Sequence, residues 1–254
     1  MSFELHRQLL ARFLRPGDRV LEIGAGPGRF TIAMAGLGAH VTVTDLSAAQ
    51  LAANAERVRA AGCEDSVEAR FELDVRNVSR FADGEFDLAV AFGGPLSYVF
   101  EAAPQALAGL LRVTRPGGHV LGSVMSLLGT WKYFLPGVLE DEISYGVSAS
   151  DRVLDTGDMR HLAGAAHMCQ LYTAAELSEL VQHAGGQLAA MSASNWASLG
   201  DVPALERIAA DPRRWAAFLD REAAACAQTG ALDGGTHLLF AATQGPQAKD
   251  VHVL

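Results

Sequence analysis

The sequence is poor in cysteine and in charged residues, and it lacks any long apolar run. Its 3 cysteines, Cys63, Cys169 and Cys226, lie far apart and form no C-x-x-C pair, which argues against a disulfide scaffold and a structural zinc site. No uncharged apolar stretch reaches the roughly 18 residues that a membrane-spanning helix needs, so we expect no membrane partner. The first residues lack the basic region and apolar run of a secretory signal, and the cytoplasm is therefore the expected compartment.

Positive charge is scarce as well. The sequence has 20 lysines and arginines against 29 aspartates and glutamates, which gives a formal net charge of −9. Such a surface repels a phosphate backbone unless basic residues gather in one patch. Here they form short pairs such as Arg213 and Arg214. We therefore expect no nucleic-acid partner.

What the chain does have is length, apolar content and glycine. Its 254 residues are 50% hydrophobic and include 26 glycines, which is ample for a buried core and excludes a disordered or fibrous chain. No internal repeat, low-complexity segment or linker divides it. The sequence therefore predicts a single domain over residues 1–254, with insertions at 127–170 and 197–235.

Strand-like and helix-like segments alternate along most of the chain. Strands are expected at 20–23, 40–44, 67–73, 86–92, 119–125, 187–193 and 236–243, and helices at 29–37, 47–61, 96–113, 173–185 and 202–229. Ser47 and Thr173 are expected N-caps, and Glu176 completes a capping box with Thr173. Alternation of this kind implies right-handed crossovers and a parallel sheet, so the expected class is a doubly wound α/β fold.

The most informative motif follows the first predicted strand. Residues 22–30 read EIGAGPGRF, and glycines there let the backbone turn tightly and let a ligand approach closely. The G-x-G-x-G spacing differs from the G-x-G-x-x-G of dinucleotide sites, and no P-loop lysine is present. Glu22, just before the turn, is poorly placed beside a pyrophosphate. It suits a cationic ligand.

Two further carboxylates come directly after the next two strands. Asp45 ends the second strand, where a carboxylate can accept both hydroxyls of a ribose, and Asp74 follows the third strand beside the apolar Val75. This pair suits the amino group and ring face of an adenine. Ligands of open α/β sheets bind at the carboxyl ends of the strands, so these two acids and Glu22 are expected to face one site.

Taken together, these motifs resemble those of the class I S-adenosylmethionine-dependent methyltransferases. The resemblance is carried by the segments 20–30 and 86–94, the turn at 115–118, which reads RPGG, and the acids Asp45 and Asp74. It covers residues 14 to 125 well and the last two strands in outline. It implies a Rossmann-like sheet of seven strands, mostly parallel with an antiparallel last strand, and helical insertions that form a substrate lid.

The resemblance also implies the cofactor, S-adenosylmethionine, and its product, S-adenosylhomocysteine. The first motif is expected to hold the methionine part, Asp45 the ribose, Asp74 and Val75 the adenine, and the end of the fourth strand the sulfonium. The expected cofactor residues are Glu22, Gly24, Ala25, Gly26, Gly28, Asp45, Leu46, Asp74, Val75, Phe92 and Gly93. Each feature alone could be an ordinary turn or helix cap, but all of them at successive strand ends favour a cofactor site.

The methyl acceptor is expected to be a small molecule. Methyltransferases that modify bases of nucleic acids resemble one another in an Asp/Asn/Ser-Pro-Pro-Tyr/Phe motif after the fourth strand, where this chain reads GGPL from Gly93 to Leu96. In-line positioning beside the sulfonium would transfer the methyl group to O, N or C of the acceptor. Trp131, Tyr133 and Trp196 could wall the acceptor or fill the core between added helices.

His161, His167 and Tyr172 are the candidates for a general base, since imidazole titrates near neutral pH. The two histidines could equally be surface or core residues. Together with Cys169 they could be imagined as metal ligands, but their spacing does not support this, so no metal is expected. The sequence does not determine the oligomeric state, and a homodimer is possible.

Two alternatives remain at this point. The chain could bind the cofactor yet catalyse another reaction or act as a partner subunit. It could also be an NAD-dependent oxidoreductase, although the glycine spacing and Glu22 argue against that.

Overall fold

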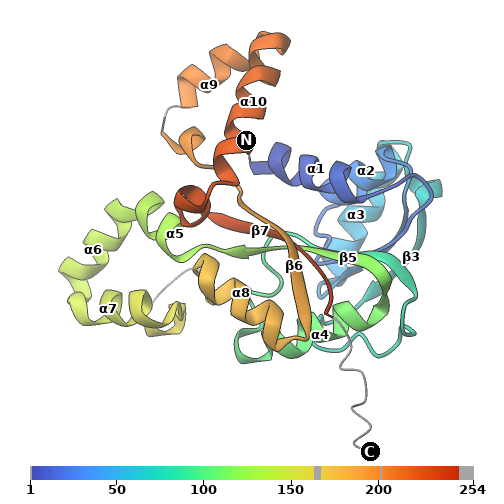
Figure 1. Ribbon diagram of the computed structural model, residues 1–254, viewed down its shortest axis with the longest axis horizontal. Coiled ribbons are helices and arrows are strands. Elements are labelled where there is room, and N and C mark those ends of the chain that lie inside the picture. Colours follow the sequence, from blue (N-terminus) through green and yellow to red (C-terminus); the bar gives the residue numbers. More distant parts are fainter. Residues whose placement is uncertain (1, 163–166, 201, 246–254) are drawn as a thin grey trace, which may run out of the picture.

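A seven-stranded sheet forms the centre of the molecule (Figure 1). The computed structural model describes residues 2–162, 167–200 and 202–245, so residues 163–166 and 201 of the two predicted insertions lie outside it. The strands are β1 Arg19–Ile23, β2 His40–Asp45, β3 Val67–Glu72, β4 Phe86–Ala91, β5 Thr114–Met125, β6 Gly186–Ala193 and β7 His237–Gln244. Their order is β3-β2-β1-β4-β5-β7-β6, with β7 antiparallel to both neighbours, which confirms the predicted fold class.

Ten α-helices lie within the described residues. They are α1 Ser2–Phe13, α2 Arg29–Gly36, α3 Ala48–Ala60, α4 Ala103–Val113, α5 Leu127–Tyr133, α6 Leu135–Tyr145, α7 Val147–Thr156, α8 Ala174–His183, α9 Val202–Ala209 and α10 Pro212–Cys226. Short 3-10 turns named below are η2 Phe100–Ala102, η3 Met159–His161, η4 Ala197–Leu199 and η5 Thr229–Gly234. None of these described helices is both long and apolar enough to cross a bilayer.

Both faces of the sheet are covered by helices, which makes the fold doubly wound. On one face, Leu107 of α4 and Leu177 of α8 are buried with Phe240 of β7. On the other face, Leu10 of α1 and Met34 of α2 are buried with strand residues of β1, β2 and β4. Each fully buried side chain of this size contributes roughly 1.5–3 kcal/mol. Burial on both faces explains why the central strands β4 and β7 read as nearly continuous apolar runs.

The helix predicted over 96–113 is wrong over residues 96–102. Gly93 and Gly94 have φ angles of +82° and +85°, and Phe100 has the positive φ of +47°. The amide of Ser97 donates to the carbonyl of Gly94 at 2.8 Å, which closes a turn. The chain after β4 therefore forms a loop and the 3-10 turn η2, and α4 begins at Ala103.

The predicted helix over 202–229 is also interrupted. The Asp211 carboxylate accepts from the amides of Arg213 and Arg214, and Pro212 opens α10, so a new helix starts there. The predicted N-caps are confirmed. Ser47 accepts from the amide of Gln50, and Thr173 forms a capping box with Glu176.

Strand direction decides where ligands can bind. Because β7 is antiparallel to both β5 and β6, β6 points the same way as β1 to β5. The carboxyl ends of six strands therefore lie at one edge of the sheet. The loops after β1, β2 and β4 and the starts of α5 and η4 all leave from that edge, which is where open α/β sheets bind ligands.

Candidate functional site

The turn between β1 and α2 is shaped by three glycines with left-handed backbone. Gly24, Gly26 and Gly28 have φ angles of +65°, +51° and +87°. A Cβ on Gly24 would lie 3.0 Å from Cγ of Pro95, and one on Gly28 would lie 3.0 Å from Nδ2 of Asn54. A Cβ on Gly26 would meet nothing described nearer than 4.0 Å. Two of the glycines thus allow close packing, and Gly26 leaves an open side for a ligand.

Glu22 is a buried carboxylate at the end of a chain of hydrogen bonds. The hydroxyl of Thr31 donates to its Oε2 at 2.6 Å, Nδ2 of Asn54 donates to that hydroxyl at 2.9 Å, and Nε of Arg70 donates to Oδ1 of Asn54 at 3.1 Å. Burial raises the pKa of Glu22 to about 8, with the Thr31 hydrogen bond opposing the rise and the charge of Asp45 adding to it. With this pKa the acid is neutral near pH 7, and a cation bound beside it would lower the pKa and favour the carboxylate.

Asp45 joins the ends of β1 and β2. Its Oδ2 accepts from the amide of Gly26 at 2.8 Å and its Oδ1 from the amide of Ser47 at 2.9 Å. Each carboxylate oxygen keeps a lone pair for a further donor, such as a ribose hydroxyl. The next residue, Leu46, is 66% exposed, so its apolar side chain is accessible to a ligand bound at Asp45.

Asp74 is already paired. Nε of Arg76 donates to its two oxygens at 3.0 and 2.8 Å, and the hydrogen bond from Arg76 lowers the pKa of Asp74. A ligand amino group would share this carboxylate with the guanidinium. Val75 is buried in the core beside Val78, so contact of Val75 with an adenine would come from its backbone.

The end of β4 combines a buried ring with open backbone. The ring of Phe92 is buried against Phe30 and edge-on against His6, with centroids 5.0 and 4.8 Å apart. The amide of Gly93 donates to the hydroxyl of Ser123 at 2.9 Å, and a Cβ on Gly93 would meet no described atom within 4 Å. There is thus open space directly beside the expected sulfonium position.

His6 is a site neighbour that the sequence analysis missed, together with all of α1. Its Nδ1 lies 2.8 Å from the carbonyl oxygen of Ser2. Because a carbonyl can only accept, Nδ1 carries the proton and Nε2 keeps a lone pair. Burial lowers the pKa of His6 to about 4, so the ring is neutral near pH 7. The signal in the sequence was the helical spacing of Leu5, Leu9 and Phe13.

The structure does not gather the candidate general bases. His161 and His167 are exposed. Tyr172 is buried in the core, and burial raises its pKa to about 12, which disfavours a role as base. In the part of the chain that the structure describes, no three histidine, cysteine or acidic side chains form a possible metal site. That finding includes the set of both histidines with Cys169.

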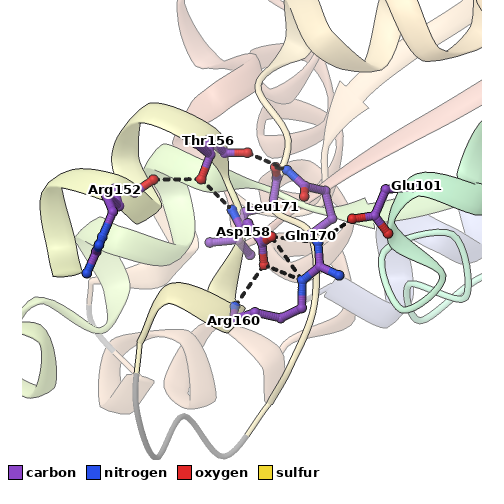
Figure 2. A network of polar contacts seen from close by, with 7 residues as sticks. All are labelled: Glu101, Arg152, Thr156, Asp158, Arg160, Gln170 and Leu171. Atoms are coloured by element: carbon purple, nitrogen blue, oxygen red, sulfur yellow. Dashed lines mark hydrogen bonds and ion pairs between the residues drawn. The ribbon is translucent and has the colours of Figure 1, made fainter.

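A network of polar contacts fastens the first insertion to the loop after β4 (Figure 2). The guanidinium of Arg160 binds the carboxylates of Asp158 and Glu101 and lies 4.1 Å from the ring centroid of Phe100. A backbone hydrogen bond connects the same two segments: the amide of Gln170 donates to the carbonyl oxygen of Ser97 at 2.8 Å. These contacts hold the insertion against the segment that follows β4, at the carboxyl edge of the sheet.

Two of the three predicted acceptor residues line one cavity. Tyr133 of α5 and Trp196, which precedes η4, border a space of about 430 Å³ together with Lys132. Trp131 does not line it and is 39% exposed. Sequence reasoning missed Lys132, which lies between the two aromatic residues of α5 that it did single out.

Comparison with known proteins agrees with this geometry. Residues 20–118 match the family described as methyltransferase domain. The chain is 38% identical over 117 residues to malonyl-(acyl-carrier protein) O-methyltransferase of Erwinia billingiae, covering 44% of this chain and 41% of that protein. It is 32% identical over 148 residues to tuberculostearic acid methyltransferase of Mycobacterium tuberculosis, covering 54% and 34%. The chain thus spans about a third to a half of these relatives.

Two solved structures share the fold. The cyclase SpnF has a TM-score of 0.61 at 19% identity, covering 96% of this chain and 81% of SpnF. The 1,6-didemethyltoxoflavin-N1-methyltransferase of Burkholderia thailandensis, solved with 1,6-didemethyltoxoflavin and S-adenosylhomocysteine, has a TM-score of 0.56 at 19% identity, covering 96% and 79%. At such identities the likeness concerns the fold.

Residues 20–118 of the chain thus match a methyltransferase domain, and the cofactor that this match implies is S-adenosylmethionine. The residues present fit that cofactor. Glu22 is a buried acid suited to a cation, Asp45 has free lone pairs for two hydroxyls, and Gly26 and Gly93 leave open space.

The pKa of Glu22 predicts how stability depends on pH. The folded-state pKa of about 8 lies above the ordinary 4.5, so this stabilising contribution is full below pH 4.5 and is lost as pH rises through 8. From pH 6.5 to 8.5 we expect wild type to lose about 2 kcal/mol more free energy of unfolding than Glu22→Gln, as urea titrations would measure. The exposed Glu56→Gln serves as control. Equal losses in all three proteins would contradict the assignment.

The anchoring of the insertion predicts a contrast between two variants. A Cβ on Gly157, whose φ is +70°, would lie 2.1 Å from the carbonyl oxygen of Leu171. Gly157→Ala should therefore cost about 2 kcal/mol or more. Arg160→Met removes two ion pairs of a half-exposed guanidinium and its contact with the ring of Phe100, and should cost less, about 1 kcal/mol or below. The reverse order would show that the ion pairs, and not the backbone contacts, hold the insertion.

Proposed function

We propose that the chain transfers a methyl group from S-adenosylmethionine to a small-molecule acceptor. The observation that carries this proposal is the position of two features at one edge of the sheet. Glu22 and Asp45 lie near the carboxyl ends of β1 and β2, and the open glycines Gly26 and Gly93 follow β1 and β4. The aromatic cavity lies between the segments that follow β5 and β6.

In this proposal each residue has a physical task. Glu22 faces the cationic end of the cofactor, Asp45 accepts from the ribose hydroxyls, and Leu46 covers the adenine. Gly24 and Gly28 allow the turn, and Gly93 leaves space beside the sulfonium. When bound, the cofactor supplies an electrophilic methyl group. The chain positions the acceptor in line with it and excludes water.

The acceptor side is proposed from the insertions. We propose that residues 127–170 and 197–235 of a single domain recognise the acceptor and cover it, with transfer to O, N or C. The relatives are named for a carrier-bound malonyl group and a fatty acid, and a structural neighbour for a heterocycle, which supports a small molecule over nucleic acid. The net charge of −9 points the same way. The cytoplasm remains the expected compartment.

A second candidate function is catalysis without methyl transfer. The fold of the chain is similar to that of the cyclase SpnF. Because proteins of one fold can catalyse different reactions, this likeness is the reason for retaining the second candidate. In this case the chain would bind the cofactor yet convert its substrate with no methyl group moved.

Cofactor binding is tested by calorimetry with S-adenosylmethionine and S-adenosylhomocysteine. Wild type should bind both. Asp45→Asn should weaken binding by about 10- to 100-fold, because hydrogen bonds to a charged acceptor are worth roughly 1.5–3 kcal/mol. The exposed Asp65→Asn should bind like wild type. If wild type bound neither compound, the proposed function would be wrong.

Methyl transfer is tested by incubation with methyl-labelled S-adenosylmethionine and a panel of small acceptors. We expect label in the product and one S-adenosylhomocysteine formed per labelled product. Product formed without label, with the cofactor unconsumed, would support the second candidate.

A further inference from the structure

The cavity beside α5 is placed to hold the acceptor, an inference that rests on the proposed function. The helix α5 follows β5 directly, and Trp196 and η4 follow β6. Both strands point toward the edge of the sheet where β4 ends, and β5 is the neighbour of β4. A molecule in this cavity therefore lies at the same edge as Gly93.

The Trp196 side of the cavity is fixed by a buried acid. Glu222, only 2% exposed, accepts from the amide of Trp196 at 2.7 Å and from the amides of Ala197 and Ser198 at 3.3 and 3.1 Å. A Cβ on Gly234 would lie 2.8 Å from Cδ1 of Trp196. The indole thus contacts the backbone of η5, and Glu222 holds the backbone segment that carries it.

The α5 side rests on the same stretch of backbone. A Cβ on Gly129 would lie 1.7 Å from the carbonyl oxygen of Gly235, and the hydroxyl of Thr130 donates to the carbonyl of Thr236 at 3.3 Å. Because α5 and Trp196 both pack against residues 234–236, the separation of the two walls is fixed.

The lining combines aromatic rings with one positive charge. Besides Tyr133 and Trp196, the described residues of its lining are Lys132 and the small or apolar Ala197, Leu199 and Gly200, and none of these is an acid. Lys132 forms no ion pair with any residue of the described ranges. In a chain of net charge −9, an unpaired ammonium between aromatic walls invites an anionic ligand.

We propose that the acceptor is an aromatic carboxylate, whose carboxylate pairs with Lys132 and whose ring packs on Tyr133 and Trp196. The volume of about 430 Å³ lies within the range of small-ligand pockets. Planar rings pack well on aromatic walls. An ammonium pairs with a carboxylate through charge-assisted hydrogen bonds.

The test uses probe binding and needs no turnover. Calorimetry compares naphthoate, its neutral isostere naphthamide, and cyclohexanecarboxylate, each added to wild type saturated with S-adenosylhomocysteine. Naphthoate should bind about 10-fold or more tightly than either of the other two, which corresponds to roughly 1.4 kcal/mol. The first comparison isolates the charge and the second isolates the ring.

Variants then locate the effect. Lys132→Met should bring naphthoate down to the affinity of naphthamide, and Lys132→Arg should restore the preference. Trp196→Leu should weaken both naphthalene probes, whereas Trp215→Leu, which changes a tryptophan of α10 outside the cavity lining, should change neither.

Two outcomes would overturn the proposal. One is equal binding of naphthoate and naphthamide to wild type, or binding of neither. The other is a preference for naphthoate that persists in Lys132→Met. With normal binding of S-adenosylhomocysteine, either result would reject this acceptor class and leave the proposed function standing. Failure of cofactor binding, measured separately, would reject the proposed function itself.

Discussion

The carboxylate of Asp45 is the contact on which the geometry of the site depends. It stands at the end of β2 and holds the amide of Gly26 in the turn after β1 and the amide of Ser47 at the start of α3. Neighbouring parallel strands leave their carboxyl ends at one edge, but nothing in the sheet itself fixes the loops there. One acid ties two of those loops together and still has lone pairs for a ligand.

The remaining parts of the site are arranged around that contact by burial. Glu22 is enclosed and linked through Thr31 and Asn54 to Arg70, so its charged form is costly until a cation arrives. Phe92 is packed under the end of β4 by α1 and α2, which leaves the backbone of Gly93 facing open space. The proposed cofactor half is thus built from strand ends, and the proposed acceptor half from α5 and the segment at Trp196, which both pack against the backbone of residues 234–236.

The sequence predicted the strand-end half of the molecule well. Apolar strands, glycine spacing and isolated acids are local signals, so the order of elements from 19 to 125 and the candidate cofactor residues could be read directly. The helix over 96–113 was mistaken at its start because the turn at Gly94 and the positive φ of Phe100 are backbone features without a periodic pattern. The helices α5 and α6 showed no clean period because several of their large apolar residues, such as Tyr133 and Ile143, stay exposed. The cavity beside Lys132 is lined by residues more than 60 positions apart, such as Lys132 and Trp196, and no local pattern encodes such an arrangement.

A crystal structure of the chain with S-adenosylhomocysteine tests the central claim most directly. The account predicts the ribose hydroxyls on Asp45, the amino group of the methionine part toward Glu22 and the sulfur beside Gly93, facing the cavity of Tyr133 and Trp196. A ligand bound with its ribose away from Asp45, or with its sulfur turned away from that cavity, would contradict it.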